Sequence, residues 1–345
     1  NKMRCLIVFL FLLLVLVSVD ISSAQGAWIN YTSTNRINDL AVYHQYVWCG
    51  TTGGVICWDT QNNTYITYTT ADGLLDNNVK SIAVGPDCEV WCGMSYNGVC
   101  HFDGKEWTSY PESGKLVNPW AIAVGLDGMP WVGTWDRGLF RFNGAEWAQK
   151  DTAPDAFVYS IDVAPNGDVW CGFGVHSTYK SGGGVRVYNN EGQIKKYTTA
   201  QGLGTNHINT VAVGYHGEAW CASALDFISR LDGDKWTTFA SSSIISEGWP
   251  SDIAISPLGE VWMARMDFHT NGIKGLAKYT DGELRIFTAE DGLADDIPNA
   301  VEIDDSGNVW VGTNNGLTQF DGRTWKIFRS EEIPGITRIS SIGED

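Results

Sequence analysis

Short apolar runs separated by turn residues recur along almost the whole chain, and one clear copy extends from Asn308 to Trp325. Two apolar runs meet across Asn314-Asn315-Gly316, and a second reversal at Asp321-Gly322 leads into a third run. This pattern predicts a meander of antiparallel strands. The run Val309–Val311 is apolar at consecutive positions, which favours a strand packed between two neighbouring sheets.

A tryptophan in the first run marks each copy of the unit. It recurs seven times at intervals of 39 to 50 residues, at Trp48, Trp91, Trp131, Trp170, Trp220, Trp262 and Trp310. A period of this length without a helical pattern is typical of propeller blades, each of which is one four-stranded sheet. We therefore predict an all-β fold, a β-propeller of seven four-stranded antiparallel blades with these tryptophans at one structural level.

The order of strands within a unit separates the two ends of the ring. Each unit begins with an apolar inner strand, of which Val79–Val84 is one example. A tight glycine turn, such as Asp127-Gly128, precedes the tryptophan strand, and a second one, such as Asn143-Gly144, precedes the outer strand. Both tight turns therefore share one end of the ring. The opposite end carries the variable loops, where binding residues usually concentrate.

Both ends of the propeller sequence look like partial units. Residues 28–32 resemble an outer strand and residues 336–342 an inner strand. The first is expected to compete with Trp325–Phe328 for the outer edge of the seventh blade, in which case a second propeller starts near residue 325. The alternative is an eight-bladed ring with a truncated last blade.

The N-terminal residues have the features of an export signal. Lys2 and Arg4 precede an apolar run from Leu6 to Val17, and small residues at 22–24 offer a cleavage site. The run is too short for a membrane-spanning helix, which needs about 20 residues. We expect a signal peptide at residues 1–24, a single propeller domain at 25–345, a periplasmic or secreted location and no membrane insertion after cleavage.

The chain is acidic, with a formal net charge of −17. Cleavage at residue 24 would remove two basic residues and one acidic residue, so the mature chain is no less acidic. Such a surface repels phosphate backbones and anionic lipids, which argues against nucleic acid and membrane partners. A small molecule, a glycan or a protein remains as the expected partner.

The cysteines follow the repeat rather than a disulfide framework. Four of the eight directly follow a repeat tryptophan, in a slot that other copies fill with Val or Met: Cys49, Cys92, Cys171 and Cys221. We interpret these four as small core hydrophobes. The states of Cys57, Cys88 and Cys100 stay open, including one bridged pair.

The sequence shows no motif for a metal or a cofactor. It contains no CxxC, and its six histidines lack ligand spacing such as HExxH. Gly182-Gly183-Gly184 precedes a predicted strand rather than a helix, so it does not form a phosphate cradle. The stretch Asp305–Trp310 matches part of the Asp-box of sialidase propellers, which is a structural turn. Neither a cofactor nor a metal is expected.

The combined pattern resembles the two-component regulator propeller repeat. The shared features are Trp-Val-Gly-Thr at 310–313, Asn-Gly-Leu at 315–317, Phe-Asp-Gly at 320–322 and Asp-Gly-Leu at 291–293. The resemblance covers about residues 27–345 and implies a non-enzymatic module for ligand sensing or protein interaction, like the sensor part of hybrid histidine kinases. Streptogramin lyases are similar in strand pattern, so a lyase or hydrolase is the alternative.

Loop length gives the candidate binding site. The predicted second-to-third loops are longest at Phe173–Gly184 and Arg265–Gly275, and Asp226-Phe227 replaces the usual turn in the unit between them. Aromatic and charged residues together suit sugar or peptide recognition. The predicted ligand-binding residues are His176, Tyr179, Lys180, Asp226, Phe227, Arg265, Asp267 and His269. Neutral loop insertion is the alternative interpretation.

Overall fold

The computed structural model describes residues 36–96, 98–111, 116, 118–152, 157–174, 183–223, 227–240, 249–266 and 275–329. The described residues form seven four-stranded sheets in which all pairings between neighbouring strands are antiparallel. Two short 3-10 helices, Thr70–Asp72 and Thr199–Gln201, lie between blades. Neither helix has the length and apolar content that crossing a membrane requires.

Each blade takes its four strands from one continuous segment. Blade 1 contains β1 (Ile37–Tyr43), β2 (Tyr46–Thr51), β3 (Gly54–Asp59) and β4 (Thr64–Tyr68). Blade 2 contains β5 (Val79–Val84), β6 (Val90–Met94), β7 (Gly98–Phe102) and β8 (Trp107–Pro111). Blade 3 contains β9 (Pro119–Val124), β10 (Pro130–Thr134), β11 (Leu139–Phe142) and β12 (Trp147–Asp151). Blade 4 contains β13 (Phe157–Val163), β14 (Val169–Gly174), β15 (Gly184–Tyr188) and β16 (Gln193–Tyr197).

The remaining three blades repeat the arrangement. Blade 5 contains β17 (Thr210–Val213), β18 (Ala219–Ser223), β19 (Phe227–Asp232) and β20 (Lys235–Ala240). Blade 6 contains β21 (Trp249–Ile255), β22 (Val261–Met266), β23 (Gly275–Thr280) and β24 (Glu283–Phe287). Blade 7 contains β25 (Pro298–Ile303), β26 (Val309–Thr313), β27 (Gly316–Phe320) and β28 (Trp325–Phe328). The prediction of an all-β propeller with seven four-stranded blades is confirmed.

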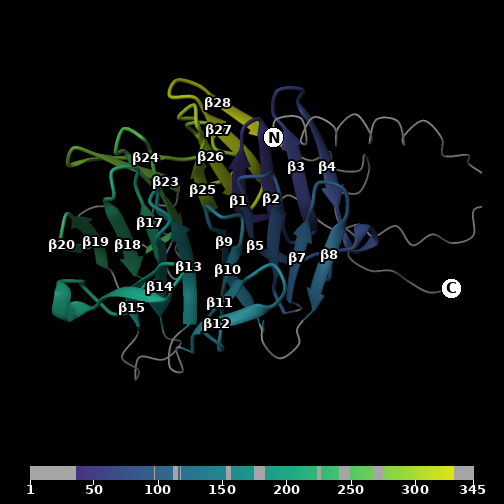
Figure 1. Ribbon diagram of the computed structural model, residues 1–345. Coiled ribbons are helices and arrows are strands. Elements are labelled where there is room, and N and C mark those ends of the chain that lie inside the picture. Colours follow the sequence, from purple (N-terminus) through teal and green to yellow (C-terminus); the bar gives the residue numbers. More distant parts are fainter. Residues whose placement is uncertain are drawn as a thin grey trace, which may run out of the picture.

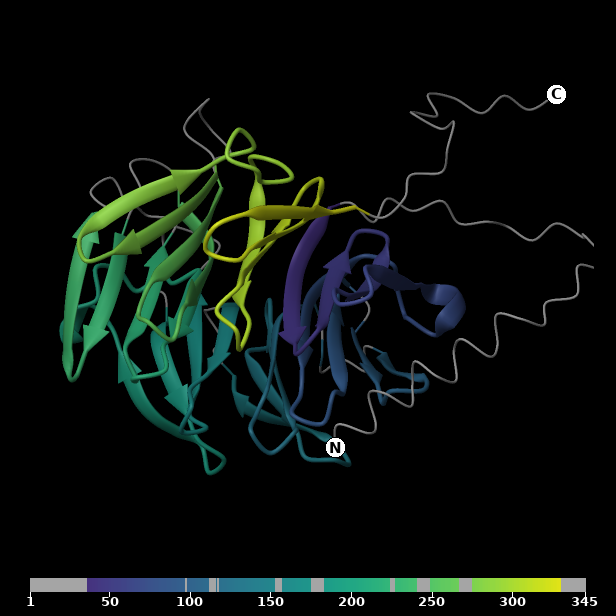
Figure 2. The same ribbon diagram turned by 90° about the horizontal axis from the view of Figure 1, so that it is seen from above.

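The ring closes by contact between the first and last blades. In both ribbon views the yellow strands of blade 7 lie beside the purple strands of blade 1, and β1 packs against β25 (Figures 1 and 2). Strand β28 pairs with β27, so the segment up to Phe328 belongs to this propeller. The predicted signal peptide and the predicted partial strands at 28–32 and 336–342 lie outside the described residues.

The repeat tryptophans and the cysteines beside them form the predicted core. All seven tryptophans are buried, and each lies on the second strand of its blade. The four cysteines that follow them are free and buried, as their interpretation as core hydrophobes requires. Cys57 and Cys100, whose pairing the sequence left open, are also free and buried.

A glycine two positions after the repeat tryptophan lets the next blade approach. A Cβ atom added at Gly133 would lie 2.5 Å from Val158 Cγ1 in blade 4, and one at Gly312 would lie 2.6 Å from Ile37 Cγ2 across the ring closure. Real Cβ contacts are not this short, so the position requires a small residue. Gly50, Gly93 and Gly172 occupy it in other blades, with Ala222 and Ala264 in blades 5 and 6.

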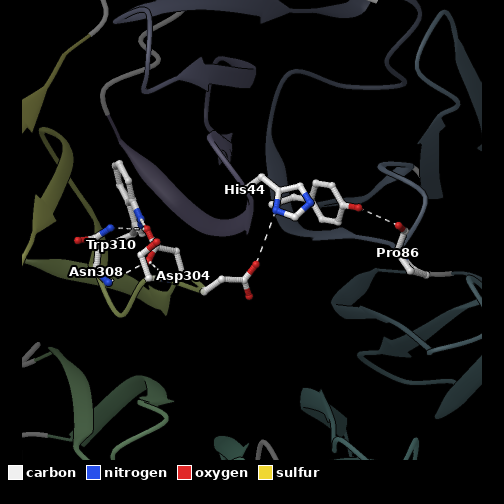
Figure 3. Close-up of polar contacts among 8 residues, drawn as sticks. His44, Pro86, Asp304, Asn308 and Trp310 are labelled. Carbon is white, nitrogen blue, oxygen red and sulfur yellow. Dashed lines mark hydrogen bonds and ion pairs between the residues drawn. The ribbon is translucent and has the colours of Figure 1, made fainter. Parts of the chain in front are cut away.

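Polar contacts at the tight-turn end join blade 1 to the blades on both sides of it (Figure 3). The Tyr43 hydroxyl donates to the Pro86 carbonyl at 2.9 Å, and His44 Nδ1 lies 3.6 Å from an Asp305 carboxylate oxygen. In the Asp-box-like turn, the carboxylate that accepts the internal hydrogen bonds is that of Asp304. It accepts from the backbone N–H of Asn308 at 2.9 Å and from Trp310 Nε1 at 3.0 Å. The turn is therefore structural.

We predict that Trp131→Ala lowers the free energy of unfolding by about 3 to 5 kcal/mol, because the side chain is almost fully buried and its removal leaves a cavity. Chemical denaturation followed by far-UV circular dichroism measures the change. Tyr96→Ala, at a position 69% exposed, is the control and should shift stability by less than about 0.5 kcal/mol. A change below about 1 kcal/mol for Trp131→Ala would contradict the packing described here.

Candidate ligand-binding site

The inner strands of all seven blades line a central cavity of about 750 Å³. Because the inner strand runs from the variable loops toward the first tight turn, its first residues lie at the loop end of the ring. We call the opening of the cavity at that end the channel mouth. Residues near the start of the inner strands form the walls of the channel mouth.

A register shift near the start of the inner strand sets one residue of most blades apart from the strand pairing. In six blades the pairing with the second strand skips one residue, which is the geometry of a β-bulge. The skipped residues all line the cavity, and they are Asn38, Lys80, Trp120, Tyr159, Ser251 and Asn299. Asn38, Ser251 and Asn299 donate to backbone carbonyls of the next blade. The bulges therefore leave Lys80, Trp120 and Tyr159 as the candidate binding side chains at the channel mouth.

Two of these residues belong to an aromatic wall formed by Trp120, Trp135, Phe157 and Tyr159 of blades 3 and 4. The ring centres of Trp120 and Trp135 lie 4.7 Å apart, and those of Trp135 and Phe157 lie 4.5 Å apart. Tyr159 meets Trp120 edge-on at 5.9 Å. All four side chains are half-buried, so they keep exposed surface at the loop end.

Two nitrogen-bearing side chains flank the aromatic wall. Lys80 Nζ, from the bulge of blade 2, lies 4.0 Å from the centre of a Trp120 ring, a cation–π distance. Burial lowers the pKa of Lys80, although nearby Asp39 opposes this effect. On the other side, the His207 ring stacks on Tyr159 at 5.9 Å. The wall thus combines flat apolar surface with hydrogen-bonding groups.

Three carboxylates in the cavity join neighbouring blades. Asp39 accepts hydrogen bonds from the N–H of Leu40 at 2.9 Å and of Ile82, in the next blade, at 2.8 Å. Asp162 repeats this arrangement between blades 4 and 5, and Asp252 repeats it between blades 6 and 7. Both oxygens of each carboxylate are therefore engaged by backbone donors, which assigns the three residues to the framework.

Burial nevertheless disfavours the charged form of these groups. It raises the pKa of Asp39 to about 6 and that of Asp252 to about 7, although the backbone hydrogen bonds oppose the shift. Burial, reinforced by the charges of Asp252 and Asp162, raises the pKa of Glu302 well above its ordinary value. Glu302 lines the cavity in blade 7, opposite the repeat residue Trp310.

The structure describes two of the eight ligand-binding residues that the sequence predicts. Phe227 begins β19 and is 37% exposed, as expected for a rim residue. Arg265 is only 1% exposed, so its prediction as an accessible charge is wrong. It lies on β22 opposite Gly275, in the slot that Thr134 and Thr313 fill in blades 3 and 7. His176, Tyr179, Lys180, Asp226, Asp267 and His269 lie outside the described residues.

The channel mouth was missed because a bulge cannot be seen in a single sequence. A usable signal was present, since large aromatic residues occur near the start of the inner strands of blades 3 and 4, at Trp120, Phe157 and Tyr159. Among the described residues, no group of three or more His, Cys, Asp or Glu side chains is placed to hold a metal ion.

Comparison with known proteins supports the fold. No family model matches the chain. A 47-residue segment, 14% of this chain, is 45% identical to histidine kinase P4 of Formosa agariphila, and the match spans 3% of the length of that kinase.

Solved propellers are similar over most of the chain. A streptogramin B lyase superimposes with a TM-score of 0.67 at 14% identity, covering 86% of this chain and 95% of its own. Virginiamycin B lyase of Staphylococcus aureus gives 0.64 at 13% identity, with coverages of 82% and 95%. PorZ, a surface component of the type-IX secretion system of Porphyromonas gingivalis, gives 0.64 at 18% identity, covering 86% of this chain and 48% of PorZ. At such low sequence identities, these superpositions support the propeller fold alone.

We predict that stability falls between about pH 4 and pH 7. The folded state raises the pKa of Asp39 and Asp252 above 3.8, so their stabilising effect is complete below about pH 4 and is lost as pH rises through 6 to 7. Denaturant midpoints across this range measure the effect. Asp252→Asn should flatten the dependence, whereas Asp234→Asn, at an exposed position in the turn between β19 and β20, should leave it unchanged. An equally steep dependence in Asp252→Asn would contradict the assignment.

Proposed function

We propose that this chain is an extracytoplasmic, non-enzymatic propeller that senses a ligand at its channel mouth. The observation that carries the proposal is the aromatic wall, which presents half-buried rings from two blades beside a cavity of about 750 Å³. Ligand sites are typically concave, with aromatic surface and a few polar groups that fix orientation. A rigid ring of seven blades holds these groups in place.

A neutral glycan is the ligand class that this surface suits best. Flat aromatic faces stack on the apolar faces of sugar rings, and adjacent polar groups bond hydroxyls. Lys80 lines the cavity and provides such a group. The net charge of −17 disfavours polyanionic ligands. The channel mouth replaces the predicted loop site as our working hypothesis, because its aromatic rings pack together beside the cavity.

The engaged carboxylates support binding rather than catalysis. A general base needs a carboxylate free to reach a substrate proton, whereas Asp39, Asp162 and Asp252 each accept two backbone hydrogen bonds that join blades. The second candidate function, a lyase or hydrolase, is favoured by one observation. Glu302 lines the cavity with a raised pKa, as a general acid would.

The sensing role draws on similarity as well as on geometry. The segment related to histidine kinase P4 is consistent with a propeller that serves a signalling protein. PorZ is a propeller-containing surface component, which makes an extracytoplasmic location reasonable for this chain also. The resemblance to the two-component regulator propeller repeat points in the same direction.

We predict that the protein binds a neutral oligosaccharide and that Trp120→Ala weakens binding at least about tenfold, or 1.4 kcal/mol. Isothermal titration calorimetry with cellohexaose, mannohexaose, xylohexaose and laminarihexaose tests the proposal. Each sugar is checked for cleavage after the titration. Trp135→Ala is a second variant in case Trp120→Ala changes the melting temperature. Tyr215→Ala is the control, because this tyrosine is 72% exposed in the tight turn between β17 and β18.

Each outcome separates the alternatives. Binding that both wall variants weaken and the control leaves unchanged supports the proposal. Absence of binding to all four sugars rules out the neutral glycan, and equal affinity in the wall variants moves the site away from the channel mouth. Cleavage of any sugar that is abolished by Glu302→Gln would replace the sensor with the enzyme alternative.

A further inference from the structure

Blade 2 holds two thiols opposite each other, an arrangement absent from the other blades with a cysteine after the repeat tryptophan. Cys92 on β6 pairs directly with Cys100 on β7. The corresponding cysteines face other residues: Cys49 faces Ile56, Cys171 faces Arg186 and Cys221 faces Ser229. Residues directly opposite in an antiparallel pair have Cα atoms about 4.5 to 5.5 Å apart, within the range that a disulfide spans.

The surroundings of Cys100 distinguish it from the structural thiols. Its Sγ accepts a hydrogen bond from the Leu75 N–H at 3.3 Å and lies 3.5 Å from Ser109 Oγ. The Cys92 thiol donates toward the Cys100 carbonyl at 3.8 Å, so it points along the same strand pair. The Leu75 N–H is the donor that favours a thiolate at Cys100, because the Ser109 hydroxyl donates to the Gly73 carbonyl at 2.8 Å.

The acidities of the two thiols fit complementary roles. Hydrogen bonding with the Cys92 thiol, assisted by Ser109 and Leu75, lowers the pKa of Cys100 to about 7 against the effect of burial. Burial raises the pKa of Cys92 well above its ordinary value, and the neighbouring Cys100 adds to this effect. Cys100 is therefore the more acidic thiol of the two and is assigned as the nucleophile.

We infer that Cys92 and Cys100 form a redox-active dithiol, which closes to an intrablade disulfide when the protein meets a peroxide. The Cys100 thiolate attacks one peroxide oxygen, the O–O bond breaks, and hydroxide leaves and takes up a proton. The Cys92 sulfur then attacks the sulfenic sulfur of Cys100, the S–O bond breaks, and the departing hydroxide takes the Cys92 proton. One hydrogen peroxide and two thiols yield one disulfide and two waters.

Access to the buried pair requires local opening around Cys100, where strand β8 and the segment at Leu75 cover a core cluster shared by blades 1 and 2. Ser109 lies on β8, the outer strand of blade 2, whose residues are half-buried or exposed. Edge strands of this kind open locally at far lower free energy than the whole domain. Hydrogen peroxide is close to water in size, so limited opening admits it to Cys100.

Treatment of the folded protein with hydrogen peroxide, followed by alkylation in denaturant and peptide mass mapping, tests the inference. We expect a Cys92–Cys100 linked peptide with the loss of two hydrogen atoms, reversible with dithiothreitol. Cys49, Cys171 and Cys221, which lack an opposing cysteine, should remain alkylatable and serve as internal controls.

Cys100→Ser is the matched variant, because blade 5 already carries serine in this slot. Ser229 Oγ accepts from the Gly204 N–H at 3.3 Å and lies 2.9 Å from the Thr238 hydroxyl, which reproduces the contacts of Cys100. The variant should fold normally and leave Cys92 reduced after peroxide. Persistence of both thiols in the treated native protein, a bridge from Cys57, or over-oxidation of Cys100 without a bridge would each overturn the inference.

Discussion

The close approach of each inner strand to the second strand of the preceding blade is the contact on which this ring depends. Only a glycine or an alanine fits two positions after the repeat tryptophan, because the neighbouring strand occupies the space of a larger side chain. The same contact recurs where Gly312 meets Ile37, so ring closure uses the repeated interface and needs no special device. Seven equivalent interfaces therefore fix both the channel width and the level of the tryptophans.

This tight packing also decides which side chains are free to bind. Inner strands held at one level by the glycine contact develop a bulge near their first residues, and the bulge turns one side chain into the cavity. Below the bulges, carboxylates such as Asp39 join adjacent blades through backbone N–H groups. At the mouth, Asn38, Ser251 and Asn299 also join neighbouring blades, so the candidate binding surface is confined to the side with the aromatic wall.

The sequence predicts the features that repeat and misses those that depend on register. The spacing of the tryptophans indicates seven blades, and the slot after each tryptophan identifies Cys49 and its equivalents as core, because both follow from position within a local unit. The bulge at Tyr159 depends on pairing between strands, which no local pattern reports. Arg265 was expected at a loop, yet β22 continues through it and places it in a buried slot otherwise suited to threonine.

The central claim is that ligand binding occurs on the aromatic wall, and fluorine NMR of protein labelled with 5-fluorotryptophan tests it most directly. The chain has 16 tryptophans, and Trp120→Phe and Trp135→Phe variants assign the two resonances of interest. On titration with the hexasaccharide that binds, these two resonances should shift, while that of the buried Trp131 stays constant. Shifts confined to other tryptophans, with Trp120 and Trp135 unchanged at saturation, would contradict the account.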